Sequence, residues 1–331
     1  MRPRVSFVVD CGGEVGWGHF ARSHALALEL RGRGCDVHIY VNGVLPPFAP
    51  PDAAVGTGLP IGVVEAPPLP AGSDAVVLDL WRYSRSTADA VPRSALLVTL
   101  VDCIPLPFRA DIVVDPNVSG SGDSTGGVRL SGRDYLILRP AFDHSRPHEA
   151  RHVAGPLLVS FGGTQQGPML EQALRALATL ENRPFPHVVA VVPATVATGA
   201  ARDDSAPRLS QLTSVDDMPA LLRDAQAGLI AAGTLLHEAC ATGLPCAVVS
   251  LTAEQHAEAQ AIADRGAIVY LGHSEQVTDS EMAAALRRLA DADVRSTLAT
   301  RARTVADGAG RRRVVDAILD GMAARMQRTG S

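Results

Sequence analysis

The segment GWGHFAR, residues 16–22, places a histidine and an arginine close together after two glycines. It follows an apolar run, residues 4–10, that is typical of a buried strand, and it leads into residues 19–31, which have helical spacing. Ligands of open α/β sheets bind at such strand-to-helix turns. The helix dipole disfavours an imidazolium there, so we predict that His19 is a neutral general base. Arg22, one turn later, would hold an anion or a carboxylate. The local sequence leaves open that His19 only caps the helix.

Two more glycine turns are candidate phosphate sites. Gly233 and Thr234 follow the apolar residues 227–232, and backbone N–H groups at a helix start form a ready anion site for a diphosphate. Glu238, about one turn further on, would accept both hydroxyls of a ribose, or it would only complement the helix dipole. The sequence FGGT at residues 161–164 is a third strand-to-helix turn. A plain tight turn explains it nearly as well.

The elements that position these residues indicate an α/β protein. Short apolar runs alternate with helical patterns, and such continuous runs are typical of parallel sheets covered on both faces. We expect strands at residues 4–10, 36–41, 61–65, 75–80, 96–102, 111–115, 156–161, 187–192, 227–232 and 246–251. Residues 45–59 and 118–127 are predicted loops, and the charged, proline-containing residues 140–156 are a predicted linker. The expected domains are 1–145 and 155–331, two Rossmann-like, doubly wound domains facing a cleft. The arginines at 311–313 are expected to begin a solvated terminal helix.

The composition excludes several classes of protein. The net charge of −5 and the pI near 6.1 argue against a nucleic-acid binder. All 30 basic residues are arginine, which excludes a Schiff-base lysine and a Walker-type phosphate loop. The 5 cysteines are scattered, as in reduced intracellular proteins. No apolar stretch is long enough to span a membrane. We therefore expect a cytoplasmic monomer that is not inserted in a membrane and needs no cofactor.

Three histidines at intervals of four, His144, His148 and His152, have a spacing that would suit zinc on a helix. Pro147 interrupts that helix, so we predict no metal site.

The order and spacing of these clusters resemble one family over nearly the whole chain. The chain resembles the UDP-sugar hydrolases of pseudaminic acid biosynthesis and the related spore-coat polysaccharide proteins. These proteins share the two-domain GT-B fold of the glycosyltransferases that make lipid II. The resemblance rests on Asp10, the G-x-G-H-x-x-R run at 16–22, Asp79, Asp102, residues 110–117, FGGT at 161–164, residues 233–238 and Gly243-Leu244-Pro245.

The resemblance implies a role for each part of the site. His19 would be the catalytic base, and we expect Asp10 to help it orient water. The sugar pocket would include Gly16, Trp17, Gly18, Arg22, Asp79, Trp81 and Tyr83. The nucleoside diphosphate would be held by Gly162, Gly163, Thr164, Gly233, Thr234, Leu235, Glu238 and Gln255. The family cleaves the bond between the anomeric carbon and oxygen with inversion.

Two departures from the family pattern concern the substrate. Glu254 stands where the family usually has an asparagine, so either its carboxylate turns away from the diphosphate or the ligand differs. The run Trp81-Arg82-Tyr83 stands where the family often has a tyrosine, so the sugar pocket is reshaped.

The sequence thus predicts hydrolysis of a nucleotide-activated, UDP-linked amino or deoxy sugar. The alternatives are a glycosyltransferase that uses an acceptor hydroxyl in place of water, and a non-catalytic nucleotide-sugar-binding protein.

Overall fold

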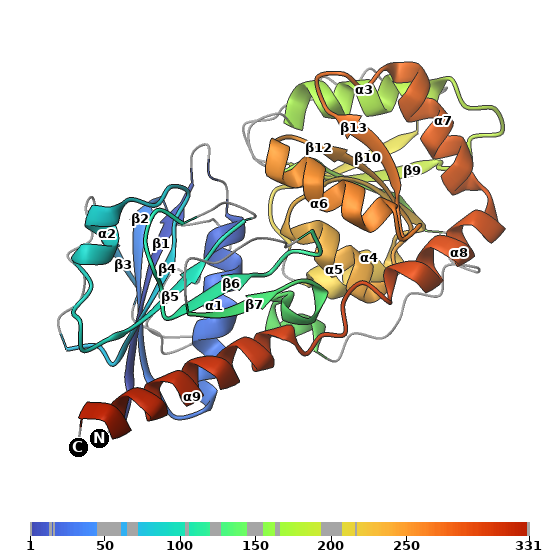
Figure 1. The fold of residues 1–331 in the computed structure, drawn as a ribbon. Helices are drawn as coiled ribbons and strands as arrows, with labels where there is room; N and C mark the ends of the chain where they lie inside the picture. Colours follow the sequence, from blue (N-terminus) through green and yellow to red (C-terminus); the bar gives the residue numbers. More distant parts are fainter. Residues whose placement is uncertain are drawn as a thin grey trace. The chain divides into compact units, whose positions relative to one another are not determined.

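The computed structural model divides the chain into two compact units (Figure 1). Unit 1 consists of Met1–Pro140 and Gly308–Ser331, and unit 2 of Ala141–Asp307. The structure describes residues 2–12, 15, 17–44, 61–64, 72–102, 106–119, 127–143, 155–162, 166–192, 207–215 and 217–329. The histidines 144, 148 and 152 lie outside these ranges, as do most of the predicted loops and linker. No helix within these ranges has both the length and the apolarity needed to cross a membrane.

Unit 1 is built on a parallel sheet of 7 strands in the order β3-β2-β1-β4-β5-β6-β7. The strands are β1 (Arg4–Cys11), β2 (Asp36–Gly43), β3 (Ile61–Val64), β4 (Ala75–Asp79), β5 (Leu96–Leu100), β6 (Ile112–Asp115) and β7 (Val128–Ser131). Every residue of β4, β5 and β6 is buried, as the continuous apolar runs predict. The strand order reverses between β1 and β4. At such a switch point a crevice opens beyond the carboxyl ends of the strands.

The helices of unit 1 are α1 (Gly18–Gly32), α2 (Arg85–Asp89) and α9 (Gly310–Thr329), with 3-10 turns at Arg133–Tyr135 and Pro140–Phe142, the latter running past the unit boundary. Helix α1 begins directly beyond the carboxyl end of β1. This placement brings the histidine motif to the switch point of the sheet.

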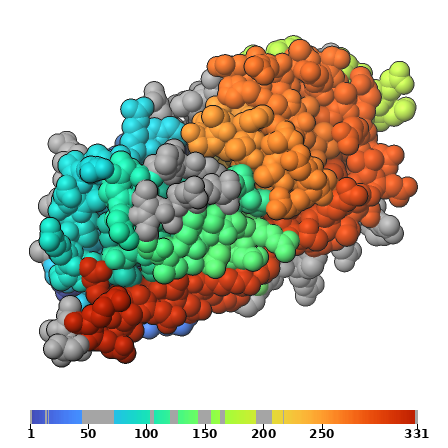
Figure 2. Space-filling model, in the orientation of Figure 1, coloured from blue at the N-terminus to red at the C-terminus, as the bar shows by residue number. Residues whose placement is uncertain are grey.

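The terminal helix α9 differs from its prediction, because it belongs to unit 1 and not to the second domain. Its apolar side chains at 314, 315, 318 and 322 share one core with α1 and the central strands. Figure 2 shows this helix, in red, along the surface of unit 1. Arg311 is not solvated: it is 3% exposed and donates to Glu29 at 3.2 Å and to the carbonyl oxygen of Leu138 at 2.9 Å. A Cβ on Gly310 would lie 2.3 Å from the carbonyl oxygen of Leu136, so only glycine allows this approach.

Unit 2 has a parallel sheet of 6 strands in the order β10-β9-β8-β11-β12-β13. The strands are β8 (Leu157–Ser160), β9 (His187–Val191), β10 (Arg208–Leu212), β11 (Ala227–Ala231), β12 (Cys246–Ser250) and β13 (Val269–His273). The helices are α3 (Gln166–Ala178), α4 (Met218–Asp224), α5 (Thr234–Thr242), α6 (Ala253–Ala263), α7 (Asp279–Ala290) and α8 (Ala292–Ala302). The order reverses between β8 and β11, so the two glycine turns of this unit follow the two strands at its switch point. The predicted doubly wound α/β architecture is confirmed in both units.

Candidate active site

The histidine motif of unit 1 forms a dyad with a buried carboxylate. His19, in the first turn of α1, places Nδ1 2.6 Å from Oδ1 of Asp79, the last residue of β4. Asp79 is 0% exposed, and Ser23 donates to its second oxygen at 2.7 Å. An ionised carboxylate only accepts hydrogen bonds, so the proton of the neutral imidazole lies on Nδ1. Nε2 is then the basic atom of His19, in the arrangement by which an aspartate orients the histidine of a catalytic triad.

Arg22 joins the dyad to a second carboxylate. Its Nε and Nη2 donate to the two oxygens of Asp79 at 2.9 and 2.6 Å. Its Nη1 and Nη2 donate to the two oxygens of Asp102 at 2.5 and 3.0 Å. Both pairs are bidentate, which suits the planar guanidinium and fixes its orientation. The sequence left open whether Arg22 binds an anionic ligand or a carboxylate of the protein. In the structure it pairs with two carboxylates of the protein.

The positive charge of Arg22 keeps the carboxylates of Asp79 and Asp102 ionised. Burial alone would raise the pKa of Asp79, but the facing Arg22 and His19 outweigh it and hold that pKa well below the ordinary value. The pKa of Asp102 is also lowered, because Arg22 again outweighs the effect of burial. The two aspartates raise the pKa of Arg22 although burial opposes this. His19 therefore lies next to Asp79 and Arg22, which both stay charged near neutral pH.

A polar arm extends the cluster along the carboxyl ends of the next strands. The Asn117 amide donates to Asp102 at 3.1 Å and to Asp115 at 3.0 Å. Asp115 is 0% exposed and pairs with Arg129 at 3.1 Å. The cluster therefore contains three carboxylates and two guanidinium groups. These groups together carry one net negative charge. That charge stabilises the positive charge that His19 acquires when it acts as a base.

We expect Asn117→Leu to destabilise unit 1, because it leaves two neighbouring carboxylates without their common donor. A hydrogen bond to a charged group contributes about 1.5–3 kcal/mol, so the free energy of unfolding should fall by at least that amount. Urea unfolding followed by circular dichroism measures the change. An unchanged urea midpoint would show that the hydrogen bonds of Asn117 to the two aspartates do not stabilise unit 1.

Two residues predicted to contact substrate, Asp79 and Tyr83, make hydrogen bonds to other groups of unit 1. Asp79 is completely buried, so we interpret it as the group that orients His19. The Tyr83 hydroxyl shares its single hydrogen between the carbonyl oxygens of Leu78 (3.0 Å) and Leu100, and its oxygen accepts from the backbone N–H of Leu80 at 3.2 Å. Burial and the nearby Asp79 raise the pKa of Tyr83 well above the ordinary value. Tyr83 therefore fastens the ends of β4 and β5 together.

Asp10, predicted to assist the base, lies beside a different set of groups. Its Oδ1 accepts from the Asn42 amide and its Oδ2 from the N–H of Trp81, each at 2.9 Å. Trp81 is 39% exposed, and its ring meets the His19 ring edge-on with centroids 6.4 Å apart. Trp17, before the first residue of α1, is 38% exposed. These are the two tryptophans of the chain, and Trp81 offers part of an aromatic face beside the base.

The residues of the predicted anion site lie at the carboxyl edge of unit 2. Gly233 is the N-cap residue of helix α5, so no side chain caps this helix. The first turn of α5 contains no acidic residue. Gly233, Thr234 and Leu235 are partly exposed. The N–H of Gly233 donates to the carbonyl oxygen of Ala231 at 2.9 Å, whereas Thr234 and Leu235 begin the helix and lie at the positive end of its dipole. Gly162, after β8, has φ of +57°, a conformation that favours glycine. Gly16, Gly163 and Thr164 lie outside the described residues.

The polar residues behind this edge differ in exposure. Glu238 is only 2% exposed, so its carboxylate would need to become accessible before it could meet a ribose. The neighbouring His237 is paired with buried Glu258 of α6 at 2.6 Å and fastens α5 to α6. Glu254 is exposed in the first turn of α6, where it complements the helix dipole. The Gln255 side chain accepts from the N–H of Leu251 at 2.9 Å.

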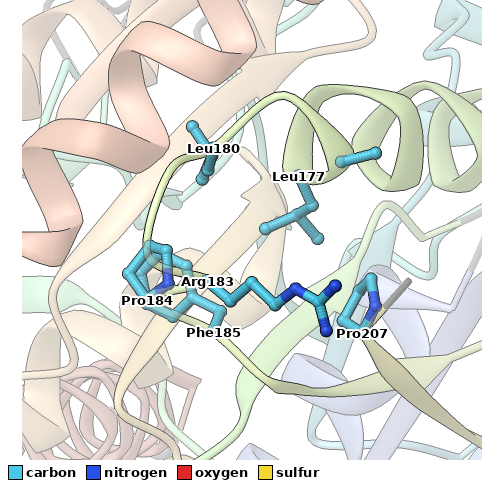
Figure 3. Close-up of a pocket in the computed structure, with 7 residues that line it drawn as sticks. Leu177, Leu180, Arg183, Pro184, Phe185 and Pro207 are labelled. Carbon is cyan, nitrogen blue, oxygen red and sulfur yellow. The ribbon is translucent and has the colours of Figure 1, made fainter. Parts of the chain in front are cut away.

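A separate cavity of unit 2 lies away from these residues (Figure 3). It has a volume of about 110 Å³ and is formed by the turn after α3 together with Pro207, which precedes β10. Figure 3 shows the Arg183 side chain extending toward Pro207. This is the amino end of β9 and β10, opposite the edge at which α/β sheets bind ligands. Within the described ranges, no three His, Cys, Asp or Glu side chains are grouped so that they could hold a metal ion.

Comparison with solved structures identifies the architecture. The chain is similar to MurG of Acinetobacter baumannii, with a TM-score of 0.68, 16% identity and coverage of 97% of this chain and 100% of that one. It is also similar to the spinosyn rhamnosyltransferase SpnG complexed with thymidine diphosphate, with a TM-score of 0.60, 17% identity and coverage of 92% and 95%. The chain has the GT-B fold. The GT-B prediction from the sequence is thereby confirmed.

Sequence comparison is more limited. No family model matches the chain. It is 29% identical over 201 residues to the spore coat polysaccharide biosynthesis protein SpsG of Bacillus subtilis, a match that covers 59% of each protein. The chain therefore matches about three fifths of that relative's length. The predicted similarity to spore-coat polysaccharide proteins is supported, whereas membership of the UDP-sugar hydrolase family stays a prediction.

Proposed function

We propose that this GT-B protein is an enzyme that transfers the glycosyl group of a nucleotide-activated sugar to a hydroxyl acceptor. The observation that carries the proposal is the His19–Asp79 dyad, at the switch point of a sheet whose fold is shared with glycosyltransferases. The sequence alone favoured water as the acceptor. The similarity to glycosyltransferases favours an acceptor hydroxyl, so hydrolysis becomes the second candidate.

In this mechanism His19 is the general base. Asp79 holds the proton of the imidazole on Nδ1, and Nε2 removes the proton of the acceptor hydroxyl as the oxygen attacks the anomeric carbon. The positive charge that develops on His19 is balanced by Asp79 and by Asp102, whose Oδ2 lies 3.7 Å from Nε2. In unit 2, the N–H groups at the start of α5 would bind the diphosphate and stabilise the charge that it gains on leaving.

The proposal is tested by incubating the protein with a panel of nucleotide sugars, with and without a mixture of sugar acceptors, while free nucleoside diphosphate is measured. Release that depends on an added acceptor supports transfer. Release at the same rate without any acceptor supports the second candidate, hydrolysis. A complete lack of release with every nucleotide sugar would contradict both and favour a non-catalytic binding protein.

Glu238→Ala tests the nucleotide side of the proposal. If Glu238 becomes accessible and accepts the ribose hydroxyls, its loss should weaken nucleotide affinity about ten- to a hundredfold, since hydrogen bonds to charged groups contribute about 1.5–3 kcal/mol. Calorimetric titration with a nucleoside diphosphate measures this, and Glu181→Ala, an exposed carboxylate in the turn after α3, is the matched control. Unchanged affinity together with a lower melting temperature would make Glu238 a structural residue.

A further inference from the structure

The basic nitrogen of His19 and one carboxylate oxygen of Asp102 are close neighbours. His19 Nε2 lies 3.7 Å from Asp102 Oδ2, and within the part of the chain that the structure describes no hydrogen-bond donor reaches Nε2. With its proton on Nδ1, the neutral imidazole presents Nε2 as an acceptor, and an ionised carboxylate also only accepts. The site thus offers two neighbouring acceptors, and the described residues provide no donor that bridges them.

The two oxygens of Asp102 differ in the hydrogen bonds that they already accept. Oδ1 accepts from Arg22 Nη1 at 2.5 Å and from the Asn117 amide at 3.1 Å, so both of its lone pairs are used. Oδ2 accepts from Arg22 Nη2 at 3.0 Å and keeps one lone pair. The Asp102 side chain is 28% exposed, whereas Asp79 is completely buried. The oxygen of Asp102 that lies near His19 is therefore the one that can still accept.

We infer that Asp102 Oδ2 selects the acceptor by accepting a hydrogen bond from a hydroxyl adjacent to the attacking one; the inference rests on the proposed transfer reaction. An alcohol has one hydrogen on its oxygen, and Nε2 takes it, so a second donor must come from a neighbouring group. A vicinal diol provides that donor, because two gauche hydroxyls are close enough to face two acceptors 3.7 Å apart. The acceptor is thus a sugar or another polyol that is attacked at one of two adjacent hydroxyls.

Asp102 exchanges no proton in this arrangement. The attacking hydroxyl gives its proton to Nε2 while its oxygen bonds to the anomeric carbon, and the diphosphate leaves with the electron pair of the broken C–O bond. The adjacent hydroxyl keeps its proton and donates it to Oδ2 in a hydrogen bond. Because Arg22 lowers the pKa of Asp102, the carboxylate remains an acceptor near neutral pH.

The test compares ethylene glycol with fluoroethanol as minimal acceptors, using a nucleotide sugar from which the protein releases nucleotide. The two alcohols are similar in size, but fluorine replaces one hydroxyl and cannot donate a hydrogen bond. We expect kcat/KM to be at least about tenfold higher for the diol, the effect of one hydrogen bond to a charged group. Binding is measured separately from the nitrogen chemical shift of His19 Nε2, assigned by its absence from His19→Gln. The diol should half-saturate this shift at about a tenfold lower concentration.

Asp102→Asn should remove both preferences. Its carbonyl oxygen is expected to take the Oδ1 position, where Arg22 and Asn117 both donate, so its amide nitrogen faces Nε2 and cannot accept. Asp115→Asn is the matched control, because Asp115 also accepts from Asn117 and pairs with an arginine but lies on the next strand. This variant loses the same charge and should keep the preference for the diol.

Three results would overturn the inference: equal or absent responses of the wild type to the two alcohols, a preference that survives Asp102→Asn, or a preference that Asp115→Asn also removes. If Asp102 were only structural, its loss would lower both rates equally and leave their ratio unchanged. Failure of the proposed function is a separate result. Release that needs no acceptor, or no release at all, overturns the transfer reaction, and the binding preference at His19 then decides the inference alone.

Discussion

Replacing His19 by glutamine is expected to lower turnover by about 10²–10⁴-fold, the usual contribution of a positioned general base. The structure supports this because Nδ1 is bonded to a buried, ionised carboxylate, which leaves Nε2 to accept the proton. Glutamine has no titratable group to take over that role. Nucleotide affinity should stay within a few-fold, since the predicted diphosphate site is at α5 in unit 2. Steady-state nucleotide release and calorimetric titration measure the two quantities.

His38→Gln is the matched control for this substitution, because His38 lies on β2 with its side chain 30% exposed and bonded to surface Asp36. Its turnover should equal that of the wild type. Near-normal turnover of His19→Gln would leave His19 with only a structural role, as a partner of the buried Asp79. A parallel loss of nucleotide affinity would make it a substrate contact.

The fold was predictable where strands are buried on both faces. β4, β5, β11 and β12 are short, continuous apolar runs, and each lies within a range that the sequence predicted. β7, β10 and β13 were missed. Each is an edge strand of its sheet and carries polar or partly exposed residues, as in VRLS at 128–131 and RLSQL at 208–212. Such strands have no continuous apolar run, so the signal used for the others was absent.

The site was predictable only where its parts are close in sequence. His19 and Arg22 are one helical turn apart, and their motif was found. The partners of Arg22 are 57 and 80 residues away, and their pairing depends on the strand order β1-β4-β5. A local signal did exist, because Asp79 and Asp102 each end an apolar run. The resemblance selected both positions, but sequence alone gave no means of distinguishing a substrate contact from a group that orients the base.

The terminal helix shows the same limit. The arginines at 311–313 look like a solvated helix start, yet Arg311 is buried against Glu29 on α1. These partners are 282 residues apart, so no local pattern indicates that the chain returns to unit 1. Only the packing of the apolar face of α9 on the first core establishes it.

Asp79→Asn is expected to have the largest effect of any change that keeps side-chain volume. The corresponding aspartate-to-asparagine change in serine proteases costs about 10⁴-fold in turnover, because the amide stabilises the wrong tautomer of the histidine. Here an asparagine amide facing Nδ1 would favour the tautomer with its proton on Nε2, so the basic atom would point away from the acceptor. We expect a loss of comparable size in nucleotide release.

The same substitution should destabilise unit 1, because Arg22 stays buried with only one of its two carboxylates. Breaking a buried ion pair from one side costs about 3–5 kcal/mol. The pKa of Asp79 is lowered in the folded state, so its contribution is present above the ordinary carboxyl pKa and is lost as the pH falls below it. The stability difference between wild type and variant should therefore be full at neutral pH and shrink in acid.

Asp36→Asn is the matched control for Asp79→Asn, since Asp36 forms an exposed pair with Arg4 at 3.2 Å. Exposed pairs contribute about 0–1 kcal/mol, so this variant should retain both stability and turnover. Turnover must be measured at a temperature where circular dichroism shows Asp79→Asn to be folded, so that lost activity is not lost protein. A folded Asp79→Asn variant with near-wild-type turnover would show that Asp79 only supports the fold, and that the tautomer of His19 is fixed by another group.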